Sequence, residues 1–170
     1  QVIVFTNYKN QVERIADFLT KNKLPAMAIS SLMTQAQRNK VIQNFKDAND
    51  LNILVGTDLA ARGLDIKGVD LVINFDLPQD CETYVHRIGR TGRAGETGKA
   101  MSLVSDKDVD SLMRVEEFLK HKVETSYLED TQLIKDFVPY RDLCIERAKR
   151  EGTYKTQPKI ESEIQIVGAS

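Results

Sequence analysis

Residues 2–20 read VIVFTNYKNQVERIADFLT, a short apolar run followed by a pattern of helical spacing. The run from Val2 to Phe5 is continuous rather than alternating, which is typical of a strand that is buried on both faces. After it, apolar residues recur at positions 12, 15, 16 and 19, the spacing of one face of a helix. The sequence therefore predicts a buried strand and then an amphipathic helix.

The same alternation continues through the first hundred residues. Further short apolar runs, each predicted to be a strand, lie at 26–29, 53–55, 71–73 and 100–104. A helix is predicted after Thr34, because Thr34 and Gln37 have the spacing of a capping box, and another after Ser105. Continuous β-branched runs separated by helices predict an α/β fold, in which helices cover both faces of a parallel sheet.

The composition fits one globular domain. The chain has 170 residues, of which 41% are apolar, and its 24 basic and 25 acidic residues give a net charge of −1. This balance excludes a histone-like polycation and a disordered acidic tail. No apolar run is long enough to cross a membrane, and Cys81 and Cys144 lie in no metal-binding spacing. We therefore expect no membrane partner, no metal ligands and an intracellular, reducing location.

The loop after the third predicted strand, residues 56–65, reads GTDLAARGLD. In open parallel sheets, ligands bind beyond the carboxyl ends of the strands. The glycines permit a close approach of phosphate or ribose, and the amides of a helix start attract an anion. In an alternative interpretation, Thr57 caps a short helix and Asp58 forms a surface ion pair with Arg62. The loop alone leaves both interpretations open.

Residues 86–93 read HRIGRTGR, in which three arginines are interleaved with glycine and have no acidic neighbours. Glycine recurs at 89, 92, 95 and 98, so a helix cannot continue far. The planar guanidinium group suits bidentate binding of phosphate oxygens, which predicts a phosphate-binding segment. His86 by itself is more often structural than catalytic, and no Ser or Cys nucleophile motif accompanies it.

The sequence contains no phosphate-cradling loop of the G-x-x-x-x-G-K-[ST] type. The nearest approach, GKA at 98–100, lacks both the hydroxyl that binds Mg²⁺ and the upstream glycine. The chain also begins within a predicted strand and without an initiator Met. We therefore expect a piece of a longer protein, in which another domain supplies the phosphate cradle and the metal ligands.

Five segments, taken in order, resemble the motifs of the C-terminal RecA-like domain of DEAD-box ATP-dependent RNA helicases. They are VIVFT at 2–6, QAQR at 35–38, TDLAARGLD at 57–65, NFDLP at 74–78 and YVHRIGRTGR at 84–93. Ser30 departs from the pattern, because the family usually has His at this position. The resemblance implies a RecA-like parallel sheet with helices on both faces for residues 1–120. Residues 121–170 match no motif and are expected to form a C-terminal extension, with 152–170 as a flexible tail or a segment that needs a protein partner.

The resemblance implies an ATP site that another domain completes. Arg90 and Arg93 would reach the γ-phosphate, with Arg93 as the arginine finger. Gly63 and Asp65 would contact the nucleotide, and the Asp65 carboxylate would bind the ribose hydroxyls. ATP would be bound together with Mg²⁺, and the N-terminal RecA-like domain of the same protein would hold the metal.

The resemblance also implies contacts with that N-terminal domain and with RNA. His86 and Arg87 would bridge to the DEAD carboxylates of the N-terminal domain. Phosphates of RNA would be held by the side chains of Arg38 and Thr57, and by the backbone around Thr6, Asn7, Gly56 and Asp58. We expect contacts to sugar and phosphate, with little readout of bases.

The implied function is the second lobe of an ATP-dependent RNA helicase, which alone would be inactive as an ATPase. One alternative is a non-catalytic RNA-binding or regulatory scaffold that retains the fold. Another is a related helicase that acts on DNA or on ribonucleoprotein. The presence of Arg90, Arg93 and Asp65 together argues against a scaffold, which has no physical need for them.

Overall fold

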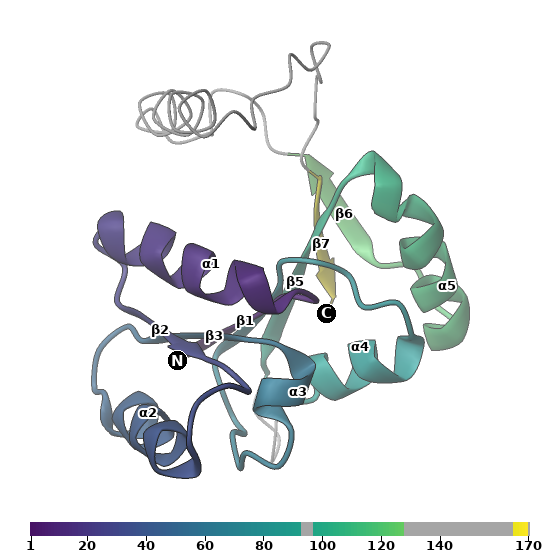
Figure 1. Ribbon diagram of the computed structural model, residues 1–170. Coiled ribbons are helices and arrows are strands. Elements are labelled where there is room, and N and C mark those ends of the chain that lie inside the picture. The colour runs from purple at the N-terminus through teal and green to yellow at the C-terminus, as the bar shows by residue number, and fades with distance from the viewer. Residues whose placement is uncertain (93–96, 128–164, 170) are drawn as a thin grey trace, which may run out of the picture.

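The computed structural model describes residues 1–92, 97–127 and 165–169. Its parallel strands are β1 (Val2–Phe5), β2 (Ala26–Ile29), β3 (Ile53–Gly56), β4 (Leu71–Asn74) and β5 (Lys99–Val104). Two antiparallel strands, β6 (Glu124–Tyr127) and β7 (Gln165–Ala169), extend the sheet. In the described residues the strand order is β2-β3-β1-β4-β5-β7-β6 (Figure 1).

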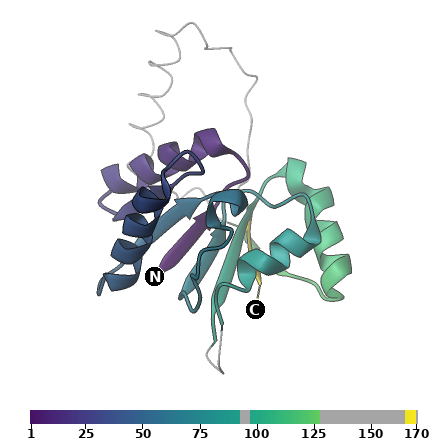
Figure 2. The ribbon, with the colours of Figure 1, turned by 60° about the horizontal axis from the view of Figure 1, so that its bottom comes forward.

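Helices join the parallel strands and cover both faces of the sheet (Figures 1 and 2). They are α1 (Lys9–Lys21), α2 (Gln35–Asp47), α3 (Asp58–Ala61), α4 (Cys81–Ile88), α5 (Val109–Leu119) and a 3₁₀ turn, η1 (Asp106–Asp108). On one face, Val2 packs in a cluster with Val12 of α1. On the other, Ile3 packs in a cluster with Phe45 of α2. Because neighbouring residues of β1 are buried on opposite faces, the predicted α/β fold is confirmed.

The predicted helix start at Thr34 is capped as its sequence indicates, whereas Ser105 precedes the 3₁₀ turn η1 and α5 begins at Val109 with no side-chain cap bond. The Thr34 amide donates to Gln37 Oε1 over 2.8 Å, and the Gln37 amide donates to Thr34 Oγ1 over 3.3 Å. The amide and the hydroxyl of Ser105 donate to Asp108 Oδ2 over 3.0 and 2.6 Å. These bonds satisfy groups that a helix start would otherwise leave without partners.

Strands β6 and β7 place parts of the C-terminal extension in the same sheet as the RecA-like core. β7 pairs with β5 on one side and with β6 on the other. Residues 165–169 are therefore a strand and not part of a tail. The sequence did not predict this strand, because its pairing depends on main-chain hydrogen bonds to β5 and not on the pattern of its side chains. Residues 128–164 lie outside the described residues. In the described part of the chain, no helix is long and apolar enough to span a bilayer.

Candidate functional site

The loops after β1, β3 and β4 leave the sheet at one edge. Phe5 at the end of β1 is in register with Gly56 of β3 on one side and with Asn74 of β4 on the other. The residues that follow these strands therefore come together, although they are far apart in the sequence. Helix α4 carries Arg87 to the same place. The edge thus contains residues of four of the segments that the sequence analysis singled out.

Arg87 is 1% exposed and uses all five of its N–H groups. Nε and Nη2 donate to the two carboxylate oxygens of Asp58 over 2.8 and 2.6 Å. Nη1 donates to Asn74 Oδ1 over 3.3 Å and to the Asp76 carbonyl over 2.7 Å, and Nη2 also donates to Asn7 Oδ1 over 2.7 Å. We refer to Arg87, Asp58, Asn74, Asp76 and Asn7 as the Arg87 network.

The Arg87 network bears on two interpretations of the sequence and corrects one of them. All five N–H groups of Arg87 have acceptors within this lobe, and the bridge to the DEAD carboxylates that the resemblance implies stays a prediction. Asp58 forms its ion pair with Arg87, and not with the exposed Arg62. The reason is that α3 ends at Ala61, so Arg62 lies beyond the helix while α4 brings Arg87 against Asp58. The other part of the alternative is confirmed, because Thr57 Oγ1 accepts from the Ala60 amide over 3.3 Å.

Thr6 and Asn7 join the end of β1 to the same network. The Thr6 side chain is fully buried, and its hydroxyl lies 2.6 Å from Asp76 Oδ2 and 2.8 Å from Gln11 Oε1. The Asn7 amide donates to Asp76 Oδ2 over 3.1 Å, and the Thr6 amide donates to the Gly56 carbonyl. Backbone N–H groups proposed for RNA therefore have protein partners at these two positions. The side chains set the shape of the loop.

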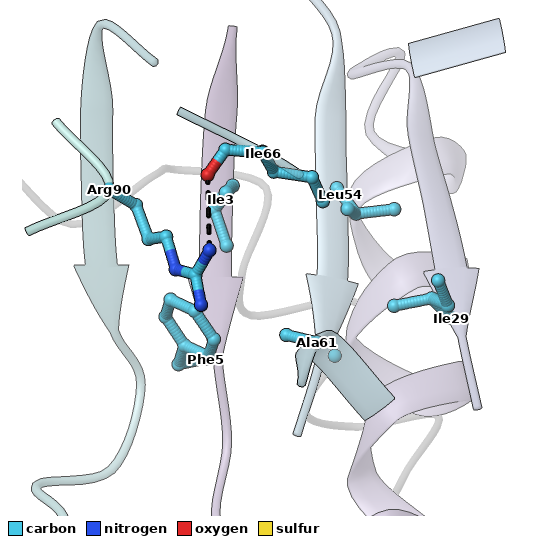
Figure 3. A pocket seen from close by; sticks show the side chains of 8 residues that line it. Ile3, Phe5, Ile29, Leu54, Ala61, Ile66 and Arg90 are labelled. Carbon is cyan, nitrogen blue, oxygen red and sulfur yellow. Dashed lines mark hydrogen bonds between the residues drawn. The ribbon is translucent and has the colours of Figure 1, made fainter. Parts of the chain in front are cut away.

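Arg90 lies one helical turn after Arg87 but has a different environment. Its Nη1 donates to the carbonyls of Leu64 and Ile66 over 3.2 and 3.3 Å. Figure 3 shows the guanidinium beside the Phe5 ring, with the bond to the Ile66 carbonyl dashed. In the part of the chain that the structure describes, Arg90 forms no ion pair. Its positive charge is therefore held by dipoles and is not neutralised by a carboxylate.

A cavity of about 110 Å³ opens beside these two arginines. Its lining residues come from β1, α3 and α4 and the segments next to them: Phe5, Asp58, Ala61, Arg62, Thr83, His86, Arg87 and Arg90. His86 is exposed, unlike its neighbour Arg87. Two of the lining residues, Arg62 and Arg90, are cations that form no ion pair in the described residues, so an anionic ligand would be stabilised at this carboxyl edge of the sheet.

The other predicted nucleotide and RNA residues have separate placements. Gly63 adopts φ +75°, and a Cβ there would meet nothing within 4 Å, so glycine is needed for its conformation and not for packing. Asp65 is exposed, and its carboxylate lies 3.3 Å from Lys67 Nζ. Arg38 donates to the Ala60 carbonyl over 2.6 Å, which ties α2 to α3. Arg93 lies outside the described residues.

Three polar residues of the site were missed by the sequence analysis. Asn74 Nδ2 donates to Ser102 Oγ over 3.0 Å, and Ser102 also shares a hydrogen bond with Tyr84. Burial raises the pKa of the Tyr84 phenol, and the bond to Ser102 offsets part of that effect. The available signal was a polar residue within or at the end of an apolar run, LVIN at 71–74 and KAMSLV at 99–104.

Comparison with known proteins identifies the family. Residues 1–95 match the family described as the helicase conserved C-terminal domain. The E. coli DEAD-box protein SrmB, in a crystal structure with regulator of ribonuclease activity A, has 38% identity and a TM-score of 0.67 over 72% of this chain and 71% of that chain. This chain belongs to the C-terminal domains of DEAD-box helicases. The predicted family and RecA-like fold are thereby confirmed.

Two curated relatives of this DEAD-box domain show how much of a whole protein it represents. The ATP-dependent RNA helicase RhlB of Psychromonas ingrahamii is 44% identical over 134 residues, which are 79% of this chain and 32% of that protein. The DEAD-box ATP-dependent RNA helicase CshA of Geobacillus kaustophilus is 48% identical over 122 residues, which are 72% of this chain and 26% of that protein. The DEAD-box domain thus spans about a third or less of the length of these relatives.

Proposed function

We propose that this DEAD-box domain is the second lobe of an ATP-dependent RNA helicase and supplies half of a composite ATP site. The observation that carries the proposal is the contrast between its two arginines. Arg87 is neutralised by Asp58, whereas Arg90 lies at the cavity with carbonyl partners and no ion pair in the described residues. A guanidinium held in this way is suited to bind an anion such as a phosphate group.

The proposed chemistry is stabilisation of charge during phosphoryl transfer. Charge is spread over the oxygens of the transferred phosphoryl group, and positioned guanidinium groups stabilise it. Arg90 and Arg93 would supply that charge, with Arg93 as the arginine finger. The open surroundings of Gly63 and the exposed carboxylate of Asp65 fit contacts with a nucleotide and its ribose hydroxyls. The N-terminal domain would bring the P-loop lysine and hold Mg²⁺.

RNA would bind at the same edge of the sheet, through sugar and phosphate. RhlB and CshA are named ATP-dependent RNA helicases, and we extend that activity to the whole protein that contains this domain. ATP and RNA would each favour the closed pairing of the two lobes, so that their binding is coupled. The closed form would bend one RNA strand and locally separate a short duplex. Hydrolysis would then permit reopening and release.

The test uses the full-length protein with Arg90→Ala, Arg93→Ala and, as a control, Arg14→Ala on the exposed surface of α1. We expect Arg93→Ala to lower RNA-stimulated ATP turnover by about 10³-fold, the lower end of the effect of an arginine finger. Arg90→Ala should also lower turnover, while Arg14→Ala should not. Near-normal turnover in Arg93→Ala would contradict the assignment. A wild-type protein that binds RNA but shows no ATPase activity would favour a scaffold.

A further inference from the structure

A row of buried polar side chains crosses the sheet beneath the candidate site. Its most buried members, all between 0% and 2% exposed, are Thr6, Asn74, Arg87, Ser102 and Tyr84. They come from the end of β1, from β4 and β5, and from α4. Hydrogen bonds connect Tyr84 through Ser102 and Asn74 to Arg87, and the Arg87 network then reaches the loops after β1 and β3.

At the centre of this row is the buried charge of Arg87, whose position is tightly fixed. A buried guanidinium is tolerated only when it is paired and when its N–H groups are satisfied. Asp58 provides the countercharge, while Asn7, Asn74 and Asp76 provide the remaining acceptors. The Phe5 ring adds a cation–π contact, with Arg87 Cζ 5.2 Å from the ring centroid. Arg87 therefore cannot move without moving the loops that hold it.

The network also reaches the arginine that we assign to ATP. The Arg90 amide donates to the Arg87 carbonyl over 3.1 Å, so the position of the Arg90 backbone depends on the position of the Arg87 backbone. At the opposite end, Asn7 and Asp58 belong to the segments proposed for RNA. One guanidinium thus joins the RNA-binding loops to the start of the turn that carries Arg90.

We propose that Arg87 is a positioning residue which transmits the state of the RNA-binding loops to Arg90, with the Asp58 carboxylate as its obligatory partner. This inference rests on the proposed function and adds the route of coupling within the lobe. When RNA orders the loops after β1 and β3, the network fixes α4, and Arg90 is held where the phosphate binds. Arg87 contacts neither RNA nor ATP.

Asp58→Asn discriminates between two roles of Arg87, namely positioning within the lobe and contact with another domain. In neither role does the Asp58 side chain itself bind RNA or ATP. If Arg87 worked by reaching another domain, removing the charge of Asp58 would leave coupling intact or improve it. In a positioning role, loss of the countercharge and of one strong acceptor loosens the network. Asp80→Asn is the matched control, since it makes the same change at the exposed N-cap of α4, and Asn caps a helix about as well as Asp.

The experiment measures ATP turnover by the full-length protein with and without a saturating RNA duplex, together with the KM for ATP. We expect Asp58→Asn to lower the ratio of stimulated to basal turnover by about tenfold, a usual size for coupling between sites. Arg87→Lys should have a similar effect, because an ammonium group cannot reproduce the five-donor fork. Asp80→Asn should match the wild type.

The outcomes separate this inference from the proposed function. A wild-type protein without RNA-stimulated turnover would refute the proposed function itself. Normal stimulation in the wild type and in Asp58→Asn would refute only the positioning role. Equal losses of basal and stimulated turnover, in step with a lost thermal unfolding transition, would also refute it, because the network would then serve the fold alone. In the double variant Asp58→Asn with Arg87→Lys, a loss no larger than in either single variant would support it.

Discussion

At the scale of single residues, the site depends on which charges are already neutralised. Arg87 and Arg90 lie in one short stretch of sequence, yet the first is buried against Asp58 and the second is bound only by carbonyl oxygens in the described residues. Sequence alone could name both arginines as phosphate ligands. Distinguishing them required the tertiary position of Asp58 at the start of α3 and of Asn74 at the end of β4.

Gly98 is a residue whose identity is set by a close approach of two chain segments. A Cβ at this position would overlap Thr91 Oγ1 and the Gly92 amide nitrogen. The Thr91 hydroxyl in turn donates to the Val69 carbonyl, so it cannot easily move aside. We expect Gly98→Ala to lower the free energy of unfolding by about 1–3 kcal/mol, the usual cost of overpacking.

Urea denaturation of the 170-residue chain would measure this change. Lys99→Ala is the control, because Lys99 is the exposed neighbour of Gly98 at the start of β5. Equal denaturation midpoints for Gly98→Ala and Lys99→Ala would show that the close approach is absent in solution.

At the scale of elements, two short helices carry most of the site, and their starts are fixed by side-chain caps. Thr57 caps the four-residue α3, and Asp80 caps α4 through the amide of Thr83 at 2.7 Å. The Thr83 amide and hydroxyl lower the pKa of the Asp80 carboxyl, so this cap weakens as the pH falls through the lowered pKa. Of these two caps, only the one at Thr57 was anticipated from its local pattern, as one of two interpretations. The direction in which each helix then presents its side chains was not anticipated, because it depends on packing.

The end of α5 offers a stabilising change. Lys120 adopts φ +60° at the C-cap, a conformation that glycine enters without the steric cost of a Cβ. We expect Lys120→Gly to raise the free energy of unfolding by about 0.5–1 kcal/mol, measured by thermal and urea denaturation. Lys107→Gly in η1 is the control and should be destabilising, since Lys107 has no positive φ. A fall in stability with Lys120→Gly would contradict the left-handed cap.

At the scale of the whole molecule, the net charge of −1 bears on the proposed binding of RNA by this domain alone. Affinity for nucleic acid without sequence preference comes mainly from neutralised phosphates, and this chain has no excess of positive charge. We expect the isolated 170-residue chain to bind single-stranded RNA with a Kd above about 10⁻⁶ M at physiological salt. The Kd should rise further, and the affinity fall, as the salt concentration rises. It should show no ATPase activity.

Fluorescence anisotropy with labelled RNA across a salt series measures the binding, and phosphate release measures the ATPase activity. The full-length protein with a non-hydrolysable ATP analogue is the reference and should bind more tightly. Tight, sequence-specific binding by the isolated chain would mean that the C-terminal extension contains an RNA module of its own. ATP hydrolysis by the pure chain would contradict a composite site.

The sequence by itself determined the alternation of strands and helices, the cap at Thr34, and the family, because these depend on local patterns and ordered motifs. Only the tertiary structure decided that Arg87 faces inward and that Asn74 and Ser102 support it. The physical reason is that pairing of a buried charge depends on neighbours from distant loops. Those neighbours meet only when parallel strands bring their carboxyl ends to one edge.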